Sequence, residues 1–241
     1  FASSEGKVQL DNVDIVWNGD RAHGVMLGSI GGSMRAGAVE LKGVTIKTNG
    51  EQAFGIDASQ FSSGPDAWVT GDRVEINTTG DGAHGARVKT KFELSNSSIT
   101  TDGPAASGIA VQGGTAELHN VQIKTGGQNS TGIHAKGVLN YEGGRVITTG
   151  ANAVGILLEG GAKAEVGVVT VNTSGAGSHG VSIDGATSAK FRDSAIVTSG
   201  DGAHGLSVRK GSPVLADTWV QAKGVGSNAI DAIDAKVNAT D

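Results

Sequence analysis

The chain has 241 residues, of which 40 are Gly, 3 are Pro and none is Cys, and its formal net charge is -5. The lack of Cys excludes disulfide scaffolds and Cys-ligated zinc sites, and no apolar run approaches the length of a membrane-spanning helix. Acidic and basic residues are intermixed along the chain instead of forming a basic stripe, so we expect no nucleic-acid partner.

A short motif recurs from one end of the chain to the other: a small residue, any residue and then Gly, after a stretch rich in Thr, Ser, Asn and Gly. Its copies are Ala22-His23-Gly24, Ala53-Phe54-Gly55, Ala83-His84-Gly85, Ala106-Ser107-Gly108, Ser130-Thr131-Gly132, Ala153-Val154-Gly155, Ser178-His179-Gly180, Ala203-His204-Gly205 and the degenerate Ser227-Asn228-Ala229. Successive copies are 31, 30, 23, 24, 23, 25, 25 and 24 residues apart. Such a period indicates an architecture of stacked repeats.

Within a repeat, apolar and polar residues alternate, which is the pattern of strands with one buried face. The fourth repeat has three such aliphatic pairs, separated by turns at Gly113-Gly114 and Asn120: Ile109 and Val111, Ala116 and Leu118, Val121 and Ile123. Three short strands per repeat, each paired in parallel with its counterpart about 4.8 Å away, would bury these faces. The sequence therefore predicts an all-β fold: a parallel β-helix, a three-sheet solenoid of about nine coils of 23–31 residues, with residues 1–241 as a single domain.

Other repeat folds fit less well. A leucine-rich repeat needs a fixed Leu and Asn framework, a propeller blade needs about 40 residues or more, and a sandwich shows antiparallel turns without a long-range copy. In the predicted solenoid the interior is filled by aliphatic residues, namely Ile15, Val25, Ile46, Ile76, Leu94, Ile99, Ile133, Ile156, Val171, Ile183, Ile196 and Val208.

Stacked coils turn each position of the repeat into a column along the rod. The column before the motif Gly holds four histidines, His23, His84, His179 and His204, and a metal site is conceivable because His179 and His204 would lie about 5 Å apart. We favour exposed turn residues there, and we expect no metal and no cofactor. A second column, Asn12, Asn96, Asn120, Asp193 and Asp217, is typical of turns in which a short polar side chain satisfies the backbone.

The outward column of the first strand tests whether the chain is an enzyme. It comprises Met26, Asp57, Arg87, Ala110, His134, Leu157, Ser182, Ser207 and Asp231. Hydrolysis of a glycosidic bond needs two neighbouring carboxylates, and β-elimination needs clustered carboxylates for a metal as well as a base. The column offers neither, so we expect no enzymatic activity; a β-helical polysaccharide lyase or hydrolase is the alternative.

The first two repeats are about seven residues longer than the others, near residues 29–34 and 59–68. Both insertions fall between the first and second strands, so we expect them to protrude on the same side of the rod, where repeat proteins place their binding loops. Met34, Phe61 and Trp68 are the candidate apolar anchors for a partner. Alternatively, Phe61 and Trp68 fold back over the sheet.

Three more residues complete the candidate partner-binding set. Phe54 interrupts the histidine column, and Arg87 and Lys89 belong to the one local basic cluster, just beyond the second insertion. Their positive charge would steer an acidic partner toward this part of the rod.

The segment Thr149-Gly150-Ala151-Asn152-Ala153-Val154-Gly155-Ile156-Leu157-Leu158 resembles the passenger domains of pertactin-like autotransporters, and the likeness extends over almost the whole chain. The resemblance implies a right-handed parallel β-helix from a Gram-negative bacterium, secreted or displayed at the outer membrane. It also implies a non-enzymatic virulence factor, an adhesin or immune-evasion factor, that binds a host protein or host cell surface. We expect a monomer that does not itself insert into a membrane, and a fragment of a longer passenger. A purely structural spacer of such a passenger is a further alternative.

Overall fold

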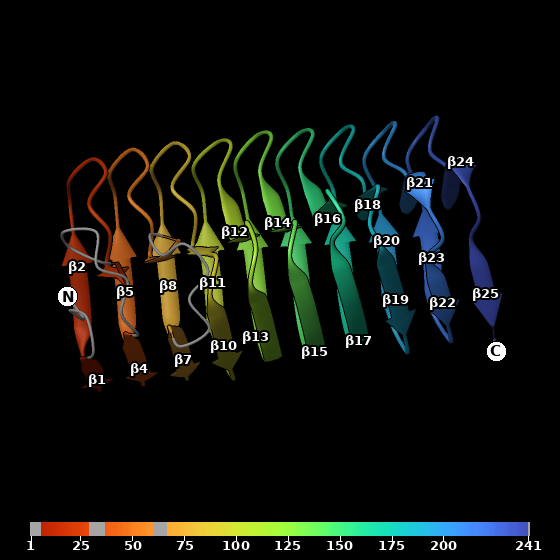
Figure 1. Cartoon of the computed structure of the whole chain (residues 1–241). Helices are drawn as coiled ribbons and strands as arrows, with labels where there is room; N and C mark the ends of the chain where they lie inside the picture. The colour runs from red at the N-terminus through yellow and green to blue at the C-terminus, as the bar shows by residue number, and fades with distance from the viewer. Residues whose placement is uncertain (1–5, 29–36, 60–66, 241) are drawn as a thin grey trace.

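The computed structural model describes residues 6–28, 37–59 and 67–240, which form 25 β-strands. Successive coils stack side by side into a rod, with the first strand at one end and the last at the other (Figure 1). No helix in the described ranges has the length and apolar character to cross a membrane. Every strand pairing is parallel, so the predicted all-β parallel solenoid is confirmed; its right-handedness stays a prediction.

The described strands form two hydrogen-bonded sheets. One has nine strands, one from each coil: β3 (Val25–Met26), β6 (Ile56–Ala58), β9 (Ala86–Val88), β12 (Ser107–Val111), β14 (Thr131–Ala135), β16 (Val154–Glu159), β18 (Val181–Asp184), β21 (Leu206–Gly211) and β24 (Ile230–Ala235). The main path of the other sheet runs through β1 (Lys7–Asp11), β4 (Ala38–Lys42), β7 (Trp68–Asp72), β10 (Lys91–Ser95), β13 (Thr115–Thr125), β15 (Val138–Thr148), β17 (Lys163–Thr173), β19 (Ser188–Arg192), β22 (Val214–Ala216) and β25 (Asn238–Thr240).

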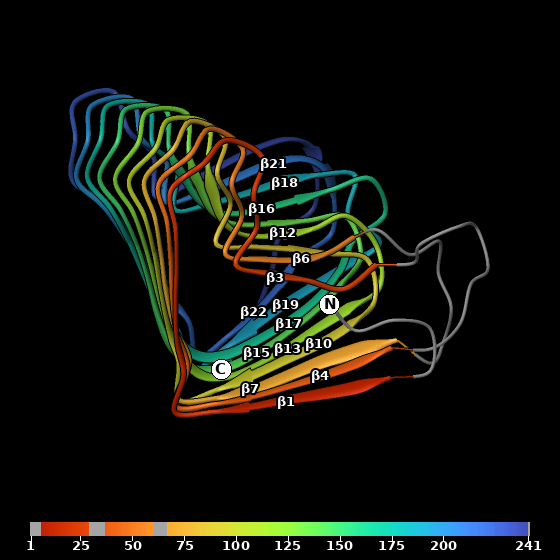
Figure 2. The same cartoon turned by 90° about the vertical axis from the view of Figure 1, so that its left-hand side faces the viewer.

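The sequence predicts three sheets, whereas the structure joins two of the three strand sets into one sheet of sixteen strands. In the outer coils the second set is separate, as β2 (Asp14–Trp17), β5 (Thr45–Thr48), β8 (Glu75–Thr78), β11 (Ser98–Thr101), β20 (Ala195–Thr198) and β23 (Trp219–Ala222). In the three central coils, β13, β15 and β17 run for 11 residues through the bend without interruption. Figure 2 looks along the stack and shows the bend that all coils share.

One residue per coil makes this bend, because it adopts a left-handed backbone conformation. The predicted turn residues do so with φ angles of 54° at Asn12, 50° at Asn96, 53° at Asn120, 49° at Asp193 and 44° at Asp217. Asn and Asp tolerate this conformation because their short polar side chains bond locally. The turn column is therefore confirmed.

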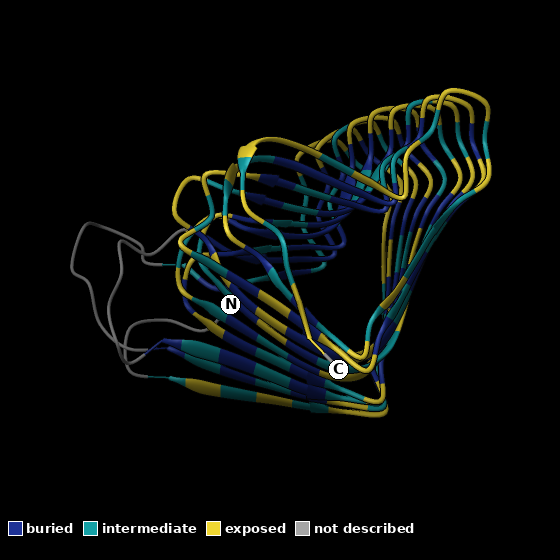
Figure 3. Ribbon diagram, turned by 90° about the vertical axis from the view of Figure 1, so that its right-hand side faces the viewer, coloured by how far each residue is buried: buried dark blue, intermediate teal, exposed yellow. Residues whose placement is uncertain are grey.

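The core is a set of aliphatic ladders between the sheets. Ile46, Ile76, Ile99 and Ile123 lie on successive strands in strict register, and all are fully buried. Each such side chain contributes about 1.5–3 kcal/mol when removed from water. All the predicted core residues are buried except Ile15, which packs against the core while partly exposed. Figure 3 shows buried and exposed residues alternating along the strands.

The Gly of the repeated motif is required by close packing between coils. A Cβ added to Gly55 would lie 2.3 Å from Cγ2 of Ile76 and 2.6 Å from the carbonyl oxygen of Gly85. Both distances are far below van der Waals contact, and one of the two atoms belongs to the backbone, which cannot move aside. The Gly of the motif therefore marks the position where the backbones of neighbouring coils are in close contact.

Candidate partner-binding face

The outer face of the nine-stranded sheet carries the column tested above for catalysis. The observed register places its members on successive strands in the predicted order: Met26, Asp57, Arg87, Ala110, His134, Leu157, Ser182, Ser207 and Asp231. The spacing between members is therefore the spacing of the strands, about 4.8 Å. Neighbouring charges in this column can pair directly.

Asp57 is the centre of a polar cluster near the N-terminal end of this face. Although its exposed fraction is 0%, its carboxylate accepts hydrogen bonds from Arg87 Nε at 3.2 Å and Arg87 Nη2 at 2.8 Å. It also accepts from the backbone N–H and the hydroxyl of Ser59, at 3.1 and 2.6 Å. A buried carboxylate is tolerated only with such partners, so Asp57 fixes the position of the Arg87 guanidinium.

Arg87 lies over an aromatic ring as well. Its guanidinium carbon is 4.2 Å from the ring centroid of Phe54, within the range of a cation–π interaction. The Phe54 ring is itself stacked between the imidazoles of His23 and His84, with centroid distances of 4.7 and 5.1 Å. The arrangement holds a cation on the surface of the rod in one orientation.

The histidines of this stack serve as hydrogen-bond acceptors. His23 Nδ1 accepts from the backbone N–H of Phe54 at 3.1 Å, and His84 Nδ1 accepts from that of Ser107 at 2.8 Å. An imidazole that accepts at Nδ1 is neutral and carries its proton on Nε2. Burial, reinforced by the charge of Arg87, lowers the pKa of His84 to about 4. Burial also lowers the pKa of His23, against the opposing effect of Asp57.

A second cluster of the same residue types lies near the C-terminal end. His179 and His204 stack at 5.0 Å, and their Nδ1 atoms accept backbone N–H groups of the following coil at 3.0 Å each. Arg209 Nη1 donates to Asp231 Oδ2 at 2.9 Å. The histidines are therefore bonded to the backbone of the next coil, which corrects the expectation of freely exposed turn residues. In the ranges that the structure describes, no group of three or more His, Asp and Glu residues is arranged to hold a metal ion.

The predicted partner-binding residues are only partly brought together. Phe54 and Arg87 touch, and Lys89 follows β9 directly, but Phe54 is 5% exposed and offers a partner little surface of its own. Trp68 begins β7 in the other sheet, where Lys7 Nζ lies 6.0 Å from its ring. Met34 and Phe61 lie outside the described residues.

Sequence reasoning missed the residues that organise the cluster, Asp57, Ser59, His23 and His84. The signal was present in part, because the column already placed Asp57 next to Arg87, and opposite charges on neighbouring strands attract. The buried state of Asp57 and the bonding of His Nδ1 to the next coil have no such signal in the sequence.

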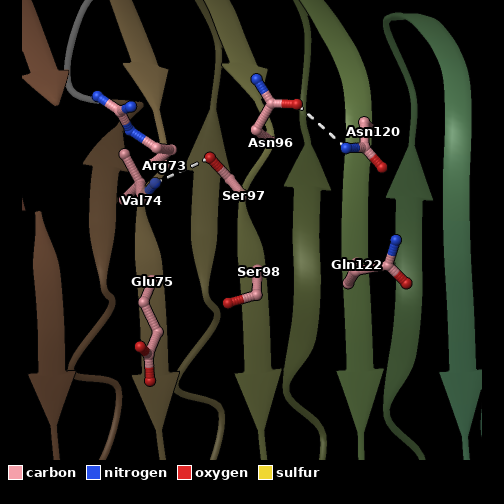
Figure 4. Close-up of a pocket in the computed structure, with 8 residues that line it drawn as sticks. All are labelled: Arg73, Val74, Glu75, Asn96, Ser97, Ser98, Asn120 and Gln122. Atoms are coloured by element: carbon pink, nitrogen blue, oxygen red, sulfur yellow. Dashed lines mark hydrogen bonds between the residues drawn. The ribbon is translucent and has the colours of Figure 1, made fainter. Parts of the chain in front are cut away.

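A separate hollow of about 430 Å³ lies over the bend of the larger sheet, between Arg73 and Gln122 (Figure 4). Its amides bond to each other and to the neighbouring strand: Asn120 Nδ2 donates to Asn96 Oδ1 at 3.1 Å, and Asn96 Nδ2 donates to Asp72 Oδ1 at 3.0 Å. Ser97 Oγ likewise accepts the backbone N–H of Val74 at 3.0 Å. These bonds identify Asn96, Asn120 and Ser97 as supports of the bend.

The fold defines the class of protein, a parallel β-solenoid, and comparison with solved structures agrees. The chain is similar in fold to the Bordetella autotransporter passenger Vag8, solved in complex with C1 inhibitor, with a TM-score of 0.70 and 22% identity. The match covers 98% of this chain and 65% of that one. An endopolygalacturonase from Stereum purpureum matches with a TM-score of 0.28 and 14% identity, over 97% of this chain and 96% of that one, and carries no weight. No family model and no curated protein matches the sequence.

Proposed function

We propose that this chain is a non-enzymatic binding rod, a section of an autotransporter passenger that captures a host protein at the bacterial surface or after release. The observation that carries the proposal is the fixed cation on the nine-stranded face. Arg87 is held by the buried carboxylate of Asp57 and by the ring of Phe54, 4.2 Å away. A guanidinium that is already immobilised loses little entropy when a partner binds.

Two findings support a binding role over catalysis. The carboxylate best placed to react, Asp57, is buried and bonded to Arg87 and Ser59, so it is not free to act as an acid, base or nucleophile. The chain also shares its fold, over nearly its whole length, with a passenger whose solved complex contains a host inhibitor. By analogy, we propose a soluble protein partner; capture of such a protein makes the chain an immune-evasion factor in preference to an adhesin.

The test is capture of proteins from host serum on the immobilised chain, followed by mass spectrometry. We expect the native chain to retain a defined protein that the double variant Asp57→Asn, Arg87→Gln loses, because this variant removes the cation without leaving a buried unpaired charge. The matched control is Arg145→Gln, since Arg145 is an exposed arginine of β15 in the other sheet. Equal retention by all three chains, or no retained protein at all, contradicts the proposal and favours a structural spacer. Cleavage of uronic-acid polymers by the native chain would support the enzyme alternative.

A further inference from the structure

Two coils beyond Asp57, the nine-stranded face has a depression of about 340 Å³. It is lined by His84, Lys89, Ala110, Val111, Gln112, His134 and Lys136. The floor is hollow because the small side chain of Ala110 stands in the outward column between the long side chain of Arg87 and the ring of His134. The depression therefore lies where a small residue of this column stands between two larger ones.

The lining is cationic and rich in donors. None of the described residues that line the depression is acidic, while Lys89 and Lys136 each bring a positive charge. His84 adds a neutral donor, because its Nδ1 accepts the Ser107 N–H and its proton is on Nε2. At the rim, Glu159 pairs with His134 at 2.8 Å and with Lys136 at 3.6 Å. Lys89 stands on the opposite side of the gap from this carboxylate.

The spacing of the two lysines is set by the register. The backbone N–H groups of Lys89, Gln112 and Lys136 bond to the carbonyl groups of Ala58, Val88 and Val111, which places the three residues on successive coils. Lys89 and Lys136 are thus two strand spacings apart, roughly 10 Å. In a polyproline II segment, which has three residues per turn and rises about 3.1 Å per residue, side chains i and i+3 point the same way and lie about 9 Å apart.

We propose that this depression binds an acidic segment of the partner protein, with two carboxylates three residues apart paired to Lys89 and Lys136. The inference deepens the proposed function and rests on it for the identity of the partner as a protein. Charge-assisted hydrogen bonds contribute more than neutral ones, and the His84 and Gln112 donors can bond the backbone of the segment between its two carboxylates. For an isolated short peptide we expect a dissociation constant of about 1 mM.

The experiment is an NMR titration of the labelled chain in low salt at pH 7 with the capped peptide Glu-Gly-Ser-Glu-Gly-Ser-Glu. The matched peptide has Gln in place of each Glu. We expect saturable shifts at the imidazoles of His84 and His134 with the first peptide and none with the second. Equal shifts with both peptides overturn the proposal, because the site would then not select carboxylates.

Variants localise the binding. The double variant Lys89→Gln, Lys136→Gln is expected to lower the affinity for the glutamate peptide at least tenfold. Ala110→Leu is expected to fill the depression and block binding without changing the charge. The control, Lys47→Gln with Lys124→Gln, changes the net charge equally on exposed residues of β5 and β13 in the other sheet. Loss of binding in the control, or unchanged binding in the lysine double variant, overturns the proposal. Binding of a sulfated heparin tetrasaccharide at Lys89 and Lys136, without binding of the glutamate peptide, also overturns the proposal.

The two proposals fail separately. Peptide binding without any captured serum protein leaves the acidic-segment site standing and contradicts the proposed function. A serum protein that is captured equally by the native chain and by the Lys89→Gln, Lys136→Gln variant leaves the function standing and overturns this site.

Discussion

The nine-stranded face carries the same kind of cluster near each end, with different degrees of burial. Both clusters combine stacked rings, histidines that accept a backbone N–H through Nδ1, and an Arg–Asp pair, which is Arg87–Asp57 in one case and Arg209–Asp231 in the other. The side chain of Asp57 is 0% exposed, whereas that of Asp231 is 21% exposed. The Arg–Asp distances are nearly equal, 2.8 and 2.9 Å, so geometry alone does not distinguish the clusters.

The two clusters differ in whether water can reach their charged groups. If the arginine is removed, water can solvate the remaining carboxylate of Asp231 but not that of Asp57, which is 0% exposed. A position in the repeat therefore fixes where a side chain lies, while burial and hydrogen-bond partners decide what it contributes to stability.

The largest expected effect on stability comes from disrupting the two Arg–Asp pairs separately. We expect Arg87→Gln to lower the free energy of unfolding by about 3–5 kcal/mol, because it leaves the buried carboxylate of Asp57 without its counter-charge. Arg209→Gln should cost less than about 1 kcal/mol, since the side chain of Asp231 is 21% exposed and water can solvate its carboxylate. Urea denaturation of both variants measures the two values, and similar costs would contradict the assigned roles of burial.

The next effect concerns pH. Between an ordinary pKa of 6.5 and the pKa of about 4 for His84, the unfolded chain binds a proton that the folded chain does not. Stability due to His84 is therefore constant above pH 6.5 and falls as the pH drops toward 4, by about 3 kcal/mol in total.

The matched variant is His84→Asn, since Asn228 occupies the same column near the C-terminal end. Unfolding free energies measured at pH 7.5 and 4.5 should differ less for this variant than for the native chain. His23 and His179, whose pKa values are also lowered by burial, leave part of the acid sensitivity in place. Identical pH profiles for the two chains would show that His84 is not held neutral.

A smaller effect concerns the bend, where one column again holds different residues. Val168 occupies the left-handed position with a φ of 56°, although a β-branched side chain disfavours it, and its side chain is 53% exposed. Val168→Asn should raise the free energy of unfolding by about 1 kcal/mol. The reverse change, Asn120→Val, should lower it by more, because it also removes the bond to Asn96. Thermal unfolding of both variants checks the signs.

The smallest expected difference in stability is between the Val variants of two buried threonines in one column. Thr148 Oγ1 donates to the carbonyl of Ala153 at 3.2 Å, whereas Thr125 Oγ1 has no hydrogen-bond partner. Thr148→Val should therefore cost about 1 kcal/mol, and Thr125→Val should be neutral or slightly stabilising. The difference in urea midpoint between the two variants is the measurement; a greater loss for Thr125→Val would mean that its hydroxyl is satisfied after all.

The coil repeat and its columns could be predicted because they follow from local patterns. Alternating aliphatic residues define buried faces, the motif Gly marks where coils touch, and the Asn and Asp residues mark the bend. The prediction of three sheets was wrong, since β13, β15 and β17 run through the bend as single strands and join two of the strand sets into one sheet. The pairing skips the left-handed residue, such as Asn120 and Gly143, and resumes at the next position.

The candidate site was less predictable. The repeat pattern predicted that Phe54, Arg87 and Lys89 lie near one another. The prediction of exposed turn histidines missed the ring stack around Phe54 and the backbone hydrogen bonds to histidine Nδ1. It also placed Trp68 in the same set, whereas β7 belongs to the other sheet.

By itself, the sequence determined that this chain is a solenoid and which residues share a column, because a periodic pattern of apolar residues can be buried only by stacking. The tertiary structure alone decided that Asp57 is buried under Arg87, that His84 is neutral, and that Ala110 leaves a cationic gap. Those properties depend on how much water reaches each group and on which backbone N–H faces it, and both are set only when neighbouring coils are in contact.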